Sequence, residues 1–193
     1  MGTRQIALIR GINVGTARRV AMADLREVFA RLGYTEVRTL LNSGNVVFTA
    51  AGGGTKARIE AAISNQFGFA ARVIVLNAAE FGEVVDGNPL AGVATDPSRL
   101  LVAFLDNPDD RALLEPLTRR NWEPEMLGIG ARAAYLWCAN GLLAGHLWEA
   151  VNRALSDAVT ARNWGTVMKI QAVVNGGETR PGPSPGRASR QTT

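Results

Sequence analysis

Polar residues and glycines gather in two short segments within the first fifty residues. Arg10-Gly11-Ile12-Asn13-Val14-Gly15 follows one apolar run, and Asn42-Ser43-Gly44-Asn45 interrupts another. Glycines let backbone N–H groups approach a ligand closely, and an arginine guanidinium offers a fork of donors to a phosphate or carboxylate. Asparagine amides and the serine hydroxyl both donate and accept hydrogen bonds. These residue types favour an anion-binding site.

A second candidate segment is Arg162-Asn163-Trp164. Asn163 is expected to cap the last helix, and a helix N-terminus with Arg162 beside it favours an anion. A structural interpretation stays open, in which Trp164 anchors the core and Arg162 forms a salt bridge. The same alternative applies to the first two segments. Asparagine and glycine are common in tight turns, and Arg10 could pair with an acid across an interface.

Several common kinds of site are excluded by the sequence. It contains no Gly-x-Gly-x-x-Gly, no phosphate loop ending in Gly-Lys-Ser/Thr, no His-Glu-x-x-His and no Gly-x-Ser-x-Gly. The single histidine, His146, and the single cysteine, Cys138, cannot build a usual zinc site, so no metal and no cofactor are expected. His146 is expected at a helix end and Cys138 in a buried strand. No general base for catalysis near pH 7 is evident.

Charge and composition limit the partners. The 193-residue chain has a net charge of +4, and residues 1–50 hold seven arginines against three acids. That excess favours a phosphate-bearing small molecule or a nucleic acid, although a solvated basic surface is the simpler explanation. No apolar run approaches the ~20 residues of a membrane span. One cysteine excludes an internal disulfide and fits a cytoplasmic location. The sequence makes no prediction of the oligomeric state.

The elements that must position these segments follow one order twice. In the first half, strands are expected at 5–9, 37–41, 46–49 and 71–76, with apolar residues at helical spacing over 22–32 and 59–67 and a short helix after Asn77. In the second half, strands are expected at 100–105, 123–129, 133–138 and 158–160, with helical stripes over 113–117, 147–155 and 167–174. Each half is therefore strand–helix–strand–strand–helix–strand plus an extra helix.

This order predicts an α+β fold of two similar ferredoxin-like (βαββαβ) subdomains in tandem, with antiparallel sheets and helices on one face. The expected domains are 1–90 and 91–175, and the Gly-, Pro- and Arg-rich tail 176–193 is expected to be disordered. In this topology the first and third strands are central neighbours. The segments 10–15 and 42–45 should therefore meet at one end of the first sheet.

The opening motifs resemble a known family. The run Ala7-Leu8-Ile9-Arg10-Gly11-Ile12-Asn13-Val14-Gly15 and the run Ser43-Gly44-Asn45-Val46-Val47-Phe48 are similar to those of the bacterial domain of unknown function 1697 family. Asn88-Pro89 and the segment 160–167 resemble its later motifs, while Thr16 and Gly165 depart from the usual Gly and Asn. The resemblance, over residues 4–174, implies a duplicated ferredoxin-like fold. It implies no activity, cofactor or catalytic residue.

Three functions fit these observations. The first is a module that binds a phosphate-bearing ligand, either a nucleotide or a nucleic-acid end, at Arg10–Gly15 and Asn42–Asn45. The strands of the first half lack the exposed aromatics on which RNA bases stack, which counts against RNA. The second is a small-molecule enzyme that uses the same segments for orientation and oxyanion stabilisation. The third is a structural or protein-interaction role.

Overall fold

The computed structural model describes residues 2–14, 18–52, 55–142 and 145–176. The first half contains β1 (Thr3–Ile9), α1 (Met22–Arg31), β2 (Thr35–Leu40), β3 (Asn45–Ala50), α2 (Thr55–Phe67), β4 (Val73–Asn77) and α3 (Ala78–Asp86). The second contains β5 (Leu100–Leu105), α4 (Glu115–Thr118), β6 (Met126–Ile129), β7 (Ala133–Trp137), α5 (Leu147–Leu155), β8 (Val159–Asn163) and α6 (Trp164–Val174), with 3₁₀ turns at Pro108–Leu114 and Ser156–Ala158.

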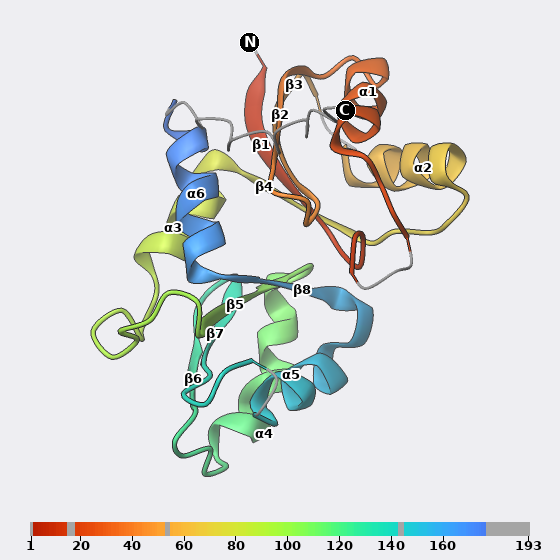
Figure 1. Ribbon diagram of the computed structural model, residues 1–193. Helices are drawn as coiled ribbons and strands as arrows, with labels where there is room; N and C mark the ends of the chain where they lie inside the picture. The colour runs from red at the N-terminus through yellow and green to blue at the C-terminus, as the bar shows by residue number, and fades with distance from the viewer. Residues whose placement is uncertain (1, 15–17, 53–54, 143–144, 177–193) are drawn as a thin grey trace, which may run out of the picture.

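Each half forms a four-stranded antiparallel sheet (Figure 1). The strand orders are β2-β3-β1-β4 and β6-β7-β5-β8, so the two sheets repeat one connection pattern. The predicted α+β fold of two similar tandem subdomains is therefore confirmed. In the first sheet β1 lies beside β3, and the Ile9 amide donates to the Gly44 carbonyl at 2.8 Å. This bond brings the end of β1 to the turn between β2 and β3.

The outer face of each sheet packs on its own helices. Alternation along a strand sends successive side chains to opposite faces, so Ala7 and Ile9 of β1 face one core while Ile6 and Leu8 face another. The outer core of the first half includes residues of α1 and α2, namely Leu25, Val28, Phe29, Ile59 and Ile63. The outer core of the second half includes residues of α4 and α5, namely Leu117, Leu147, Val151 and Leu155.

The inner faces of both sheets share one central core with α3 and α6. Its residues include Ile6, Leu8, Phe81, Val84, Val102, Phe104, Tyr135, Val167 and Ile170. Helices α3 and α6 pack against each other, and α6 also contacts β3 of the first sheet. Both faces of each sheet are thus covered, because the extra helix of each half lies on the inner face. The expectation of helices on one face therefore holds for the βαββαβ part of each half but not for the extra helices. This double coverage explains why all six residues of β5 are buried and apolar.

The expected boundary between the halves falls in the connecting segment. Helix α3 ends at Asp86 and β5 begins at Leu100. Leu90 within that segment packs in the central core, so the division into 1–90 and 91–175 stays a prediction. Of the expected disordered tail 176–193, all but Gly176 lies outside the described residues.

Within the described ranges, no helix combines the length and the apolar character needed to cross a bilayer.

Candidate functional site

The two polar segments of the first half lie against each other. Asn13 adopts a left-handed conformation (φ 54°), and its side-chain amide donates to the carbonyls of Asn42 at 2.8 Å and Val20 at 2.9 Å. The Asn13 side-chain oxygen accepts from the Val20 amide at 2.8 Å. Both polar atoms of the Asn13 side chain are therefore used in hydrogen bonds that stabilise the loop. Gly15, the last residue of the first segment, lies outside the described residues.

The Asn42–Asn45 turn is also held by its own groups. Gly44 has φ +74°, and a Cβ there would lie 2.9 Å from the Ile9 carbonyl oxygen and 3.0 Å from the Ile12 side chain. The Asn45 amide donates to the Leu40 carbonyl at 3.1 Å and to the Ser43 hydroxyl at 3.0 Å. Close packing between β1 and this turn thus explains the glycine without a ligand.

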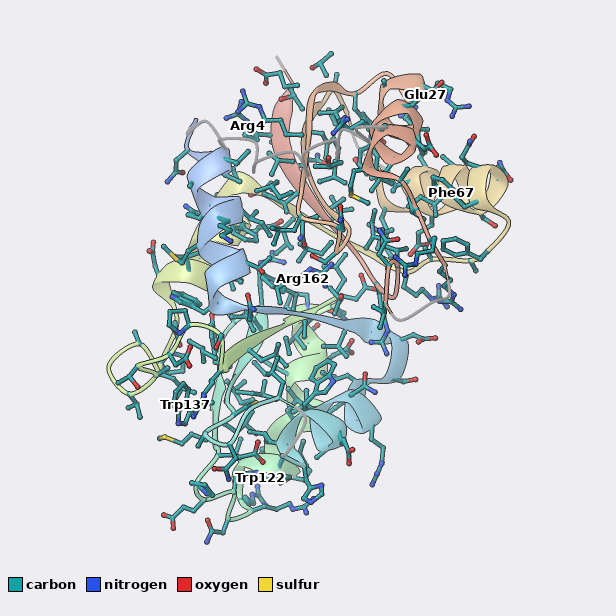
Figure 2. The ribbon with its side chains drawn as sticks, in the orientation of Figure 1. Arg4, Glu27, Phe67, Trp122, Trp137 and Arg162 are labelled. Atoms are coloured by element: carbon teal, nitrogen blue, oxygen red, sulfur yellow. The ribbon has the colours of Figure 1, made fainter. Side chains whose placement is uncertain are left out.

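Arg162 is the polar centre of the interface between the halves. It lies on β8, not at the helix start where the sequence placed it, because the strand runs to Asn163. Arg162 is 9% exposed, and Figure 2 shows it between the two halves. The guanidinium donates five hydrogen bonds of 2.5–3.0 Å, to the Asn45 and Thr160 side chains and to the carbonyls of Ile9, Ser43 and Ala161.

The charge of Arg162 has no buried counter-charge. All five acceptors are neutral, and no ion pair joins Arg162 to a carboxylate among the described residues. Burial lowers the pKa of Arg162 to about 10, so the group stays charged at neutral pH. The next residue, Asn163, caps α6 as expected, because its side-chain oxygen accepts from the Thr166 amide at 2.9 Å. A buried positive charge therefore lies where the halves meet.

Arg10 also crosses between the halves. Its guanidinium donates to the Val159 carbonyl and, at 3.0 Å, to the side-chain oxygen of Asn152 on α5. The residue is half-buried. The interface role considered for Arg10 is thus present, with neutral acceptors in place of an acid.

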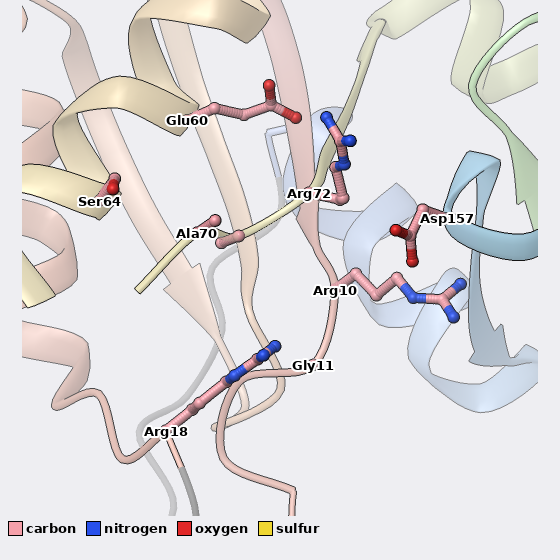
Figure 3. A pocket seen from close by; sticks show the side chains of 9 residues that line it. Arg10, Gly11, Arg18, Glu60, Ser64, Ala70, Arg72 and Asp157 are labelled. Carbon is pink, nitrogen blue, oxygen red and sulfur yellow. The ribbon is translucent and has the colours of Figure 1, made fainter. Parts of the chain in front are cut away.

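Arg10 and Gly11 line a cavity of about 480 Å³, which we call the arginine cleft. Gly11 has φ +71°, in the left-handed region. Figure 3 shows the side chains of Arg10, Arg18 and Arg72 around this cavity. Its lining residues are Arg10, Gly11, Arg18, Glu60, Ser64, Ala70, Ala71, Arg72 and Asp157. Two arginines from the segment between β1 and α1 and one arginine just before β4 therefore line one cavity.

Arg18 and Arg72 are site residues that sequence reasoning missed. Arg18 has φ 53°, and its guanidinium carbon lies 5.5 Å from the centre of the Phe69 ring. Arg72 precedes β4, and its carbonyl accepts from the Arg10 amide at 2.8 Å. Both side chains are exposed, and neither forms an ion pair with any residue in the described ranges. The antiparallel pairing of β1 with β4 is the signal that would have placed Arg72 beside Arg10.

Two carboxylates share the arginine cleft. Glu60 accepts a hydrogen bond from the Val73 amide at 3.0 Å, which fixes one of its oxygens. Asp157 is exposed, and Figure 3 shows it facing the side chains of Arg10 and Arg72. The cleft thus combines donors for an anion with acceptors for hydroxyl or amine groups.

A second cavity adjoins the arginine cleft and shares Arg10 and Gly11 with it. This apolar pocket has a volume of about 500 Å³. Its other lining residues are Val14, Leu101, Leu142, Trp148, Asn152, Thr160, Ala161 and Arg162. Val14 is 71% exposed and Leu142 36% exposed, so apolar side chains meet solvent around this cavity. The two cavities together form a polar and an apolar compartment between the halves.

The chain's usual catalytic side chains lie elsewhere. His146 is the residue before α5, its side chain is 87% exposed, and its ring lies 3.7 Å from Glu149. Cys138 is buried, and burial together with nearby Glu125 raises the pKa of its thiol to about 11. Neither residue lines the two cavities. The parts of the chain that the structure describes hold no cluster of His, Cys, Asp and Glu suited to a metal.

Comparison with known proteins defines the relationships of the chain. The fold is similar to that of a conserved bacterial protein from Streptococcus pneumoniae, with a TM-score of 0.70 and 23% identity over 90% of this chain and 99% of the other. No curated protein matches the chain. The family model described as "Protein of unknown function (DUF1697)" matches residues 2–135, which include Arg10, Arg18, Arg72 and the Asn42–Asn45 turn. The chain therefore belongs to the DUF1697 family.

Proposed function

We propose that this protein is a binding module for a phosphate-bearing small molecule, held in the arginine cleft between the two halves. One observation carries the proposal: Arg10, Arg18 and Arg72 line one cavity and form no ion pair with any described carboxylate. Arginine guanidinium groups match phosphate oxygens in geometry and charge.

Electrostatics supports an anion at this place. The Arg10 amide and the Arg72 carbonyl are paired across neighbouring strands, and like charges on opposite strands repel. Arg162 adds a buried charge and lines the second cavity together with Arg10. The carboxylates of Glu60 and Asp157 offset part of this charge. The remaining positive potential is relieved by a bound anion.

The location of the cavity favours a small molecule over a nucleic acid. Ferredoxin-like RNA binders present an open sheet face with aromatic side chains to the bases. Here α1 and α2 cover one face of the first sheet, and α3 and α6 cover the other. A single nucleic-acid strand therefore has no open sheet face to bind. The arginine cleft, in contrast, has the size typical of small-ligand sites.

In this proposal the two polar segments, 10–15 and 42–45, support the site, and among their described residues only Arg10 and Gly11 line the arginine cleft. The Asn13 side chain joins its loop to the Asn42 carbonyl, and Asn45 donates to Ser43 within the turn. Gly44 lets the turn pack against Ile9 of β1. These contacts position Gly11 and, through Arg162, the second half. For the alternative of a small-molecule enzyme, no observation comparable to the three arginines in one cavity gives support. A cytoplasmic location, expected from the single cysteine, stays a prediction.

A thermal-shift titration with pyrophosphate tests the proposal. Pyrophosphate at ten times its dissociation constant is expected to raise the melting temperature by about 3–6 °C, since a ligand that binds only the native state stabilises it. Sodium chloride at matched ionic strength is the control salt. An equal shift with both salts would contradict a specific site.

Two variants locate the binding. The double variant Arg18→Ala, Arg72→Ala is expected to lose most of the pyrophosphate shift, because both side chains are exposed and their loss leaves the core intact. Arg111→Ala is the matched control, since Arg111 is an exposed arginine that lines neither cavity. Arg10→Ala is less informative because it also removes two bonds to the second half.

A further inference from the structure

We infer that the ligand is a nucleoside monophosphate, with its phosphate in the arginine cleft and its base in the apolar pocket. This inference rests on the proposed function. It starts from the two residues that the cavities share, Arg10 and Gly11. Because both cavities are lined by Arg10 and Gly11, they are neighbours, and a molecule that extends past Arg10 would reach from one into the other. Phosphate alone is far smaller than the arginine cleft and leaves the apolar pocket empty.

The walls of the apolar pocket suit a flat ring. Trp148 offers an aromatic side chain, and Leu101 and Val14 offer aliphatic surface. Val14 is largely exposed, so a ring that covers it removes apolar surface from water. Bases stack on aromatic side chains with little sequence preference. The pocket is therefore matched to a nucleobase better than to a second charged group.

Charge at the junction of the cavities orients the molecule. Arg162 lines the apolar pocket with a guanidinium whose acceptors are all neutral, and Arg10 lines both cavities. An anion bound beside Arg10 supplies the missing counter-charge to both. The phosphate thus belongs at the Arg10 side, and the uncharged base extends toward Trp148.

The carboxylates of the arginine cleft suit the sugar. A pure phosphate site gains nothing from Glu60 and Asp157, which repel it. Ionised carboxylates only accept hydrogen bonds, and ribose hydroxyls donate them. A ligand that carries hydroxyls next to its phosphate turns these two side chains into partners. Phosphate, sugar and base together account for the arginines, the carboxylates and the apolar wall.

Calorimetric titration of the full chain with three small probes tests the inference, and a short oligonucleotide is titrated for comparison. The small probes are inorganic phosphate, ribose 5-phosphate and adenosine 5′-monophosphate. The base is expected to make adenosine monophosphate bind about tenfold more tightly than ribose 5-phosphate, the lower range of stacking on one aromatic ring. Trp148→Leu should remove most of that factor and leave the affinity for inorganic phosphate unchanged.

Trp122→Leu is the matched control variant. Trp122 and Trp148 both pack against the outer core of the second half, but only Trp148 lines the apolar pocket. Trp122→Leu should leave all three affinities unchanged.

Equal affinities for ribose 5-phosphate and adenosine monophosphate in the wild-type chain would overturn the inference and leave the proposed function standing. No binding of any probe would overturn both, and tighter binding of a short oligonucleotide than of the monophosphate would replace the small molecule with a nucleic acid.

Discussion

Replacing Arg162 with alanine is expected to lower the free energy of unfolding by about 3–5 kcal/mol, because several buried acceptors each lose a charged donor at a cost of about 1–3 kcal/mol, while removal of the buried charge offsets part of that loss. The guanidinium holds the carbonyls of Ile9 and Ser43 in the first half while β8 carries it in the second. Without it, buried acceptors lose their donors and the interface gains a cavity. Domain stabilities are only about 5–15 kcal/mol, so the loss is a large fraction.

Urea unfolding followed by circular dichroism measures this effect. Arg162→Lys is the informative comparison, because lysine keeps the charge but lacks the planar fork that reaches five acceptors. We expect the lysine variant to be nearly as unstable as the alanine variant. A lysine variant as stable as the wild type would mean that charge alone, not the hydrogen-bond geometry, is needed. A loss below about 1 kcal/mol in the alanine variant would contradict the central place given to Arg162.

Gly44→Ala is expected to lower the free energy of unfolding by about 2–5 kcal/mol. Two costs add at this position: a left-handed backbone with a Cβ, about 1–2 kcal/mol, and overpacking, about 1–3 kcal/mol. The overpacking arises because the new methyl group would lie 2.9 Å from the Ile9 carbonyl oxygen. That oxygen also accepts from Arg162, so the substitution disturbs the interface as well.

Gly68→Ala separates the two costs. Gly68 has φ +73°, almost equal to the +74° of Gly44, but a Cβ there meets nothing within 4 Å. Only the backbone cost should appear, about 1–2 kcal/mol. The same urea titration compares the two variants. Equal losses would show that the close approach of Ile9 to the turn is not the limiting contact.

The fold was predictable because local patterns and connectivity agree. The apolar run Leu100–Leu105 forms β5, and Asn77 with Glu80 forms a capping box at the start of α3. The positions of α3 and α6 were not predictable from periodicity. Their apolar residues show that they are buried, but the partner is the inner face of two sheets far apart in sequence. A pattern along one helix carries no information about which distant surface covers it.

The meeting of the segment after β1 with the Asn42–Asn45 turn followed from the topology of the first sheet alone. The roles of the individual residues did not. Asn45 looked like a ligand-binding amide, yet it is fully buried and accepts from Arg162 at 2.5 Å. That contact spans 117 residues and depends on how the halves pack. Arg18 lies just beyond the first segment, and Arg72 comes beside Arg10 only through the pairing of β1 with β4, so residue type alone did not distinguish either from other arginines.

The most direct test of the account is a crystal structure of the full chain grown with pyrophosphate. We expect phosphate oxygens in the arginine cleft, at about 2.7–2.9 Å from guanidinium nitrogens of Arg10, Arg18 and Arg72. Glu60 should keep its hydrogen bond to the Val73 amide. A cleft without pyrophosphate, in which Asp157 and Glu60 instead pair with these arginines, would contradict the account.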